Sequence, residues 1–440
     1  MKKLFLGIIF TSSIPIFATA QFSIGAQLRT RSEFRDGQGA PLPKSAHPAF
    51  FNSQRTRLMA KYNSNRVKVH IAIQDVRVWG QDVSTINRTT TQDNNGFMLH
   101  EAWAEVNLSD SLHTTRYWGL KVGRQELVYD DSRLLGNLDW LQQGRRHDAA
   151  VLKYEIQTFQ AHIGGAFNQN KENSTNTIYN AQPPGNYTAN TNGGSAYKAL
   201  AYVHLNKKLQ QGNLTYLFLN DHFSKYHFEL VDQVQTKKWD EGTYARYTTG
   251  LYYIQQLGKF TYNASAYYQF GKTPAGQNLL ATSFNGNIAY SITQQLSTCL
   301  GADYTSGGDN KAFDPLYGTA HKFWGYMDYF YAASGFGQKG LQDYYLKMKY
   351  KPAAKCLLLL DIHQFYSASE VVNHHKQFGT EADLTAQFNI NSFVNVDIGY
   401  SHFWSTNTLT SATVKNLVNA SSNSNWAYVS LNITPSFFIK

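Results

Sequence analysis

The chain has 440 residues, a formal net charge of +10 at pH 7 and an aromatic content of 15%. It contains only two cysteines, Cys299 and Cys356, so the sequence suggests neither a disulfide scaffold nor a cysteine-ligated zinc site. After the N-terminal region no segment reaches 18 consecutive apolar residues, which excludes transmembrane helices from the rest of the chain.

Residues 1–20 have the three parts of a secretory signal peptide. Lys2 and Lys3 give a positive start, residues 4–17 form an apolar segment, and Ala-Thr-Ala at residues 18–20 is a small-residue cleavage site. We therefore predict an exported protein whose mature chain begins at Gln21. Residues 21–440 are predicted to form a single domain, because no linker and no change of composition divides them.

Apolar and polar residues alternate along much of the mature chain. The segments "FSIGAQLRTRSEF" (22–34), "KFTYNASAYYQF" (259–270) and "EADLTAQFNI" (381–390) each carry an apolar face and a polar or charged face. Successive side chains of a strand point to opposite faces, so each segment is predicted to be a strand between two different environments. Such segments begin near residues 22, 53, 66, 97, 116, 149, 158, 197, 213, 244, 259, 279, 296, 342, 356, 378, 393 and 425, which gives about 18 strands.

The connections between these strands alternate in length. Short turns such as "QLGK" and "NINS" alternate with long connections at residues 34–52, 79–96, 124–148, 167–196, 220–243, 305–341 and 402–424. Bacterial outer-membrane barrels have short periplasmic turns, long extracellular loops and an even number of strands. An array of soluble β-sandwiches is the alternative, but it has no reason to keep this alternation. We therefore predict an all-β protein, a transmembrane antiparallel β-barrel of about 18 strands, in the outer membrane of a Gram-negative cell. Such a barrel leaves an aqueous channel.

Arginine is concentrated in the first third of the chain. Of the 14 arginines, 13 precede residue 147 and only Arg246 lies beyond it, whereas lysines are spread throughout. Several basic residues fall on the polar faces of predicted strands, including Lys121 between Leu120 and Val122. Guanidinium groups bind carboxylates with paired hydrogen bonds, and rings of basic side chains favour anions in pores. Two interpretations stay open: a basic lumen for carboxylate solutes, or arginine–carboxylate networks that hold the wall and the loops.

The segment "GRQELVYDDSRLLGNLDWLQQGRRHDAA" (123–150) has an unusual density of opposite charges between two predicted strands. It resembles the signature of the alginate-export family of outer-membrane barrels. Further segments resemble that family in the same order: "RTRSEF" (29–34), "SQRTRLMAKY" (53–62), "IQDVRVWG" (73–80), "EAWAEV" (101–106) and "FDPLYGTAHKFWGYMD" (313–328).

The resemblance implies an 18-stranded outer-membrane barrel, and the best-known members export anionic uronate polysaccharide by diffusion through an arginine-lined pore. By position, it implies pore-lining roles for Arg29, Arg31, Arg55, Arg57, Arg77, Arg124, Arg133, Arg145 and Arg146. The strand pattern, not the resemblance, predicts the same role for Lys121. It implies organising carboxylates at Asp75, Glu101, Glu105, Asp130, Asp131, Asp139 and Asp148. The segment 124–148 would be an outer loop folded into the barrel mouth, with Trp140 packed on the wall. The family's known members suggest a monomer.

The predicted function is passive diffusion of anionic solutes, such as uronate polysaccharide, oligosaccharide or smaller carboxylates. The alternative is a general porin whose arginines are structural. We expect no enzyme, because the sequence has no GxSxG or HExxH motif and no ordered triad. We expect no cofactor and no metal, with an oxygen-ligated cation at Asp130–Asp131 as the alternative role of that pair. The partners would be outer-membrane lipid and the solute; nucleic acid is excluded, because the protein is exported and its basic residues point into a lumen.

Overall fold

The computed structural model describes residues 21–80, 97–109, 115–169, 172–175, 177, 197–330 and 338–439. The predicted signal peptide at residues 1–20 lies outside the described residues, as do large parts of the predicted loops 79–96 and 167–196.

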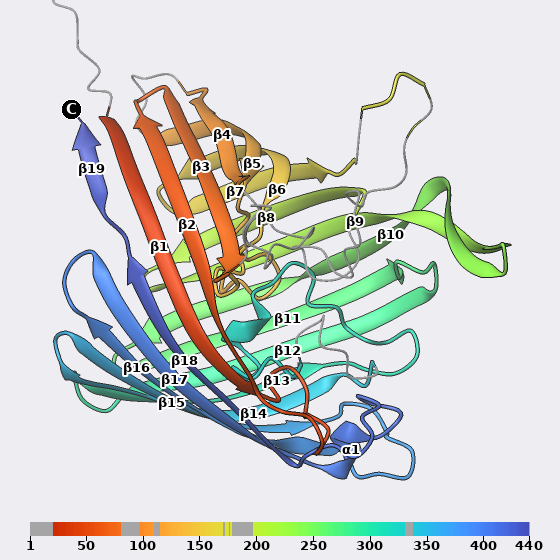
Figure 1. Cartoon of the computed structure of the whole chain (residues 1–440). Helices are drawn as coiled ribbons and strands as arrows, with labels where there is room; N and C mark the ends of the chain where they lie inside the picture. Colours follow the sequence, from red (N-terminus) through yellow and green to blue (C-terminus); the bar gives the residue numbers. More distant parts are fainter. Residues whose placement is uncertain are drawn as a thin grey trace, which may run out of the picture.

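Eighteen antiparallel strands form a closed barrel, and a short additional strand follows the last of them (Figure 1). Closure occurs at β1 (Gln21–Asp36), which pairs with β2 on one side and with β18 and β19 on the other. The other strands are β2 (Ala49–Asn63), β3 (Val67–Val78), β4 (Met98–Asn107), β5 (Arg116–Gln125), β6 (His147–Ile156), β7 (Phe159–Phe167), β8 (Ala199–Leu209), β9 (Gly212–Val231), β10 (Val234–Leu257), β11 (Phe260–Lys272), β12 (Asn278–Ser291), β13 (Leu296–Thr305), β14 (Leu341–Ala353), β15 (Cys356–Tyr366), β16 (Gln377–Asn389), β17 (Val394–Ser405), β18 (Asn423–Ile433) and β19 (Ser436–Ile439). The predicted fold class and strand number are confirmed.

The alternation of the sequence becomes the two faces of the wall. Leu58, Leu300 and Leu384 are about half exposed or more on the outside, whereas the neighbouring inward residues Arg57 and Asp383 are buried. Hydrocarbon offers no hydrogen-bond partner, so every backbone group of the wall must pair with a neighbouring strand, and closure removes the free edges. None of the described helices is long or apolar enough to cross a membrane.

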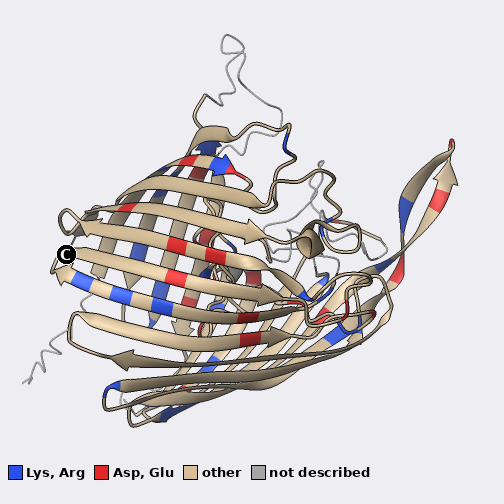
Figure 2. Ribbon diagram, turned by 90° about the horizontal axis from the view of Figure 1, so that it is seen from below, with Lys and Arg blue, Asp and Glu red and all other residues tan. Residues whose placement is uncertain are grey.

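The connection between β9 and β10 differs from the prediction. Residues 220–243, predicted as a long loop, are mostly strand, because β9 continues to Val231 and β10 begins at Val234. Asp232 and Gln233 between them have φ values of 50° and 65°, which suits a tight two-residue hairpin turn. The hairpin projects far beyond the barrel rim (Figures 1 and 2). In the projecting part of β9, Tyr226, Phe228 and Leu230 alternate with three charged or basic residues, so the sequence did carry a strand pattern here that the prediction missed.

Two long connections fold into the barrel and contact each other there. The first, residues 126–146, follows β5, and the second, residues 306–330, follows β13 and contains the short helix η1 (Ala320–Lys322). Leu135 and Tyr317 form an isolated parallel bridge, in which Tyr317 N–H donates to the Leu134 carbonyl and Gly136 N–H donates to the Tyr317 carbonyl. We call these segments the first and second inner loops.

Apolar side chains anchor both inner loops on the inner face of the wall. Leu127, Leu134 and Leu135 of the first loop pack with Leu316 and Tyr317 of the second, against inward residues of β6 to β12. A second cluster joins the C-terminal part of the second loop, from Trp324 to Phe330, to inward residues of β14 to β18. The lumen is therefore partly filled by an ordered core rather than left as an open tube.

Candidate functional site

Four arginines form a row on the inner face of β1 and β2. Arg29 and Arg31 are two residues apart on β1, and Arg55 and Arg57 are two apart on β2, with Arg29 directly opposite Arg55 in the strand register. All four side chains are buried. Four positive charges this close repel each other, so their position depends on the groups that face them.

Those groups include the backbone carbonyls of residues 139–142 in the first inner loop. Arg29 donates hydrogen bonds to the carbonyls of residues 139, 140 and 141, at 2.8, 3.3 and 3.2 Å. Arg31 donates to the Trp140 carbonyl at 2.9 Å and lies 4.2 Å from the centre of the Trp140 ring. Arg55 reaches the carbonyl of residue 142 at 3.4 Å. The arginines thus satisfy loop carbonyls that have no secondary-structure partner.

The row has more positive than negative charge. Asp139 alone pairs with both Arg29, at 3.2 Å, and Arg55, at 2.9 Å. Arg57 donates twice to the amide oxygen of Gln74, a neutral group. Burial by itself would raise the pKa of Asp139, but Arg55 and Arg29 outweigh burial and hold that pKa below its usual value. Arg29 and Arg55 therefore share one carboxylate, Arg31 pairs with Glu33 at 2.9 Å, and Glu33 is in turn shared with Arg35.

Two further basic residues of the predicted lining lack an acidic partner among the described residues. Lys121 on β5 places its Nζ atom 4.0 Å from the centre of the Trp103 ring, and no described carboxylate forms an ion pair with it. Arg146 at the end of the first inner loop donates to the Met98 sulfur, and no described residue accepts a hydrogen bond from its Nη1 atom. Both add to the positive charge on this side of the barrel.

The other predicted basic residues are engaged in local pairs. Arg77 pairs with Asp75 at 2.6 Å, and Arg124 pairs with Asp148 at 2.8 Å. Arg133 of the first inner loop pairs with Asp303 of β13 at 2.6 Å and with Asp131 at 3.3 Å. Arg145 donates to the carbonyls of Gly318 and Gly136, at 2.6 and 3.4 Å, and so ties the two inner loops together.

The remaining predicted carboxylates also have partners. Glu105 pairs with Lys153 at 2.6 Å, and Glu101 lies 3.3 Å from His70. Asp130 lies 2.9 Å from His204, whereas Asp131 accepts from the backbone and side chain of Arg133. The Asp130 and Asp131 carboxylates thus have different partners, and neither contact favours a shared cation.

An acidic wall, which the sequence reasoning did not identify, carries the second inner loop. Asp303, Asp343, Asp361, Glu381 and Asp383 are all buried on the inner face of β13 to β16. Their hydrogen bonds hold loop donors: Met327 N–H to Glu381 at 2.7 Å, Tyr326 N–H to Asp383 at 3.3 Å, and the Trp324 indole to Asp303 at 3.0 Å. The signal was present in the alternation of residues 381–390, but the sequence does not show that these acids face the loop.

The two walls thus carry opposite charge. Figure 2 shows basic and acidic residues at intervals along the strands of the barrel. The basic strands bind loop carbonyls through arginine, and the acidic strands bind loop N–H groups through carboxylates. Each wall therefore binds backbone groups of opposite partial charge in one inner loop.

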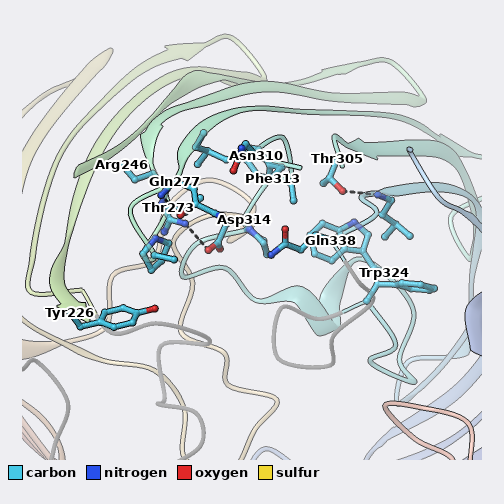
Figure 3. A pocket seen from close by; sticks show the side chains of 17 residues that line it. Tyr226, Arg246, Thr273, Gln277, Thr305, Asn310, Phe313, Asp314, Trp324 and Gln338 are labelled. Carbon is cyan, nitrogen blue, oxygen red and sulfur yellow. Dashed lines mark hydrogen bonds and ion pairs between the residues drawn. The ribbon is translucent and has the colours of Figure 1, made fainter. Parts of the chain in front are cut away.

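A cavity of about 470 Å³ lies between the second inner loop and strands β9 to β12 (Figure 3). Tyr226, Phe313 and Trp324 contribute aromatic surface, and further lining residues carry side-chain amides. At the wall of this cavity, Arg246 forms an ion pair with Asp314 at 2.6 Å. It also donates two hydrogen bonds to the carboxylate of Asp221. Arg246, the single arginine of the later chain, is therefore fully neutralised.

The sequence profile of a family described as alginate export matches residues 20–422. Among curated proteins none matches the chain. The solved structure of OccAB1 from Acinetobacter baumannii is similar, with 13% identity, a TM-score of 0.60 and coverage of 95% of this chain and 97% of that one.

Two structures from Pseudomonas aeruginosa are also similar. OccK5 (OpdH) has 12% identity and a TM-score of 0.57, over 95% of this chain and 98% of that one. OpdK, solved with vanillate, has 12% identity and a TM-score of 0.57, over 94% of this chain and 99% of that one. At these identities the likeness shows a shared barrel fold.

Proposed function

The chain belongs to the alginate-export family and is an outer-membrane β-barrel of the porin type, and from this premise we propose that it is a passive channel for solutes that carry carboxylates. The proposal covers uronate polysaccharide or oligosaccharide as well as smaller carboxylates. It involves no catalysis and no cofactor, because diffusion down a gradient needs only a selective path.

One observation carries this proposal: the basic wall holds more positive charge than its carboxylates neutralise. Arg29 and Arg55 share Asp139, and among the described residues Arg57 bonds to the neutral amide of Gln74. In a narrow water-filled pore, fixed positive charge lowers the free energy of an entering anion and raises that of a cation. A guanidinium group also matches a carboxylate with two parallel hydrogen bonds. Vanillate, bound in the OpdK structure, is itself a small carboxylate.

A second candidate function is supported by a different observation. Most hydrogen bonds of Arg29, Arg31 and Arg55 go to the first inner loop, so these side chains also have a structural task. In a general porin this would be their whole task, and selectivity would be weak. Arg57 and Lys121 distinguish the candidates best, because neither holds a loop carbonyl.

The test is the reversal potential of single channels across a salt gradient, with and without added polyuronate. We expect an anion-selective current that polyuronate blocks. Arg57→Gln and Lys121→Gln should each lower the anion-to-cation permeability ratio by roughly two-fold, because each removes one unpaired charge from the pore. Lys259→Gln, in the exposed turn between β10 and β11, removes the same charge outside the lumen and should leave the ratio unchanged.

A weakly selective, unblocked current in the wild type would contradict the carboxylate channel. So would a normal selectivity in both Arg57→Gln and Lys121→Gln, since the excess charge would then have no effect on ions. A general porin would be the remaining function in either case.

A further inference from the structure

At the start of the first inner loop, donor atoms of His100, Glu101 and Glu126 all lie within 4.8 Å of one another. His100 and Glu101 are adjacent on β4, and adjacent residues of a regular strand point to opposite faces. The register of β3 and β4 shifts here: Glu101 pairs with Ala72, whereas Leu99 pairs with the next residue, Ile73. His100 is the extra residue of a β-bulge, which turns both His100 and Glu101 toward the lumen.

The third residue comes from a different element. Glu126 directly follows β5, and its Oε1 atom lies 3.1 Å from His100 Nε2. Its other oxygen accepts a hydrogen bond from the Asn137 amide at 2.9 Å, and its backbone N–H donates to Glu101 at 3.2 Å. These contacts orient both carboxylates toward the same point. The Nε2 atom of His70 lies 3.3 Å from the Oε2 atom of Glu101.

We propose that His100, Glu101 and Glu126 form a binding site for a divalent transition-metal ion, with Zn²⁺ the best match. One imidazole and two carboxylates are ligand types that Zn²⁺ accepts, and a water or His70 would complete four-fold coordination. With Zn–N and Zn–O bonds of about 2.0–2.2 Å in a tetrahedron, neighbouring ligand atoms lie about 3.3–3.5 Å apart. The His100–Glu126 distance of 3.1 Å needs only a small adjustment.

The nitrogen atoms that face the two carboxylates are the ones that an ion would use. His100 is fully buried, and its Nε2 atom faces Glu126, while the Nε2 atom of buried His70 faces Glu101. An ion between these groups would replace the two contacts, and the Nδ1 atoms, on the other side of each ring, would stay outside the site.

Nearby positive charge limits the expected affinity. Arg57, Arg146 and Lys121 lie on the same side of the lumen, and their charge repels a cation. We therefore expect a dissociation constant on the order of micromolar, weaker than that of structural zinc fingers. A bound ion would connect β4 to the start of the first inner loop and fix where that loop enters the barrel. This inference does not depend on the transported solute.

The test is isothermal titration calorimetry of the full chain in detergent with ZnCl₂, after removal of metals with EDTA, and with MgCl₂ in a parallel titration. We expect one Zn²⁺ per chain and no Mg²⁺ binding. Glu126→Gln and His100→Gln should each weaken Zn²⁺ binding at least ten-fold. His227→Gln is the matched control, because it removes a histidine that contacts Glu229 and Asp240 on the exposed hairpin.

Absence of Zn²⁺ binding to the wild type would overturn the proposal. Binding that survives both Glu126→Gln and His100→Gln, or that is lost in His227→Gln, would overturn it as well. If His100→Gln fails to fold, Glu101→Gln takes its place, because that change keeps the shape of the side chain and alters only its charge. Far-UV circular dichroism of each variant checks that the barrel has formed.

Discussion

At the residue scale, the arginines of β1 and β2 serve the backbone of the protein itself. A guanidinium group offers five N–H donors in a fixed plane, so one side chain can satisfy several carbonyls and still attract an anion by its charge. Arg29 binds three consecutive loop carbonyls and also contacts Asp139. The structural and the electrostatic interpretations of these residues are therefore compatible, because a hydrogen bond to a carbonyl leaves the positive charge in place.

The lowered pKa of Asp139 predicts how acid affects the first inner loop. A carboxylate whose pKa is lower in the folded protein contributes stability above its ordinary pKa of about 3.9 and loses it as the pH falls through the lowered value. We expect constant single-channel noise from pH 8 to pH 5 and a rise in noise below about pH 4. In Asp139→Asn the higher noise should be present at neutral pH. Equal noise in Asp139→Asn and wild type at pH 7 would contradict this role.

At the element scale, the β9–β10 hairpin is the part least connected to the rest of the barrel. β8 pairs with β9 only as far as His222, and β11 pairs with β10 only from Arg246 onward. Beyond these residues the two strands pair with each other alone, and their register shifts between Trp239 and Thr243. The barrel wall therefore does not depend on the projecting part.

Deletion of residues 225–242, with Asn-Gly joining Ser224 to Thr243, should leave the barrel intact. These two residues pair across the hairpin, and Asn-Gly favours a tight turn. We expect a change in unfolding free energy within about 0.5 kcal/mol, as for other changes on an exposed surface, and an unchanged conductance. Denaturant unfolding and single-channel recording check both values, and failure to assemble would show that the hairpin is needed for folding.

In the molecule as a whole, two walls of opposite charge, separated by β17 and β18, organise the lumen. The basic wall holds the first inner loop, the acidic wall holds the second, and the buried Arg133–Asp303 pair joins the first loop to the acidic wall. Gly318 allows the loops to meet, because a Cβ atom there would lie 1.8 Å from the Arg133 carbonyl oxygen. An 18-stranded barrel is wide enough for an aqueous channel, so these loops determine how much of it stays open.

Replacement of residues 130–143 by a short Gly-Ser linker should therefore raise single-channel conductance by roughly two-fold or more, since the barrel itself would leave a wide pore. The hairpin deletion is the control, because it removes a similar length of chain from outside the lumen. An unchanged conductance in the loop variant would mean that the constriction lies elsewhere. A variant with higher conductance should also lose selectivity, because its charges would then lie far from the centre of the pore.

The sequence predicted the strands better than the loops. The predicted strand starts at residues 116, 296 and 356 coincide with those of β5, β13 and β15. The β9–β10 hairpin was missed although residues 225–230 alternate as in a strand, because residues 231–243 do not keep the alternation, which only lipid contact requires. The bulge at His100 was missed because it changes the direction of a side chain without altering the composition around it.

The barrel, its strand number and the position of the long connection after β5 could be predicted from the sequence, because the contrast between lipid and water imposes a two-residue period on every strand. The contacts of the charged residues could not, because they form only in the folded barrel. Arg29 and Trp140 are 111 residues apart, and Asp383 and Tyr326 are 57 apart. Contacts over such distances depend on the curvature and register of the closed wall. A local pattern specifies which side of a strand a residue faces, but not which group faces it from across the lumen.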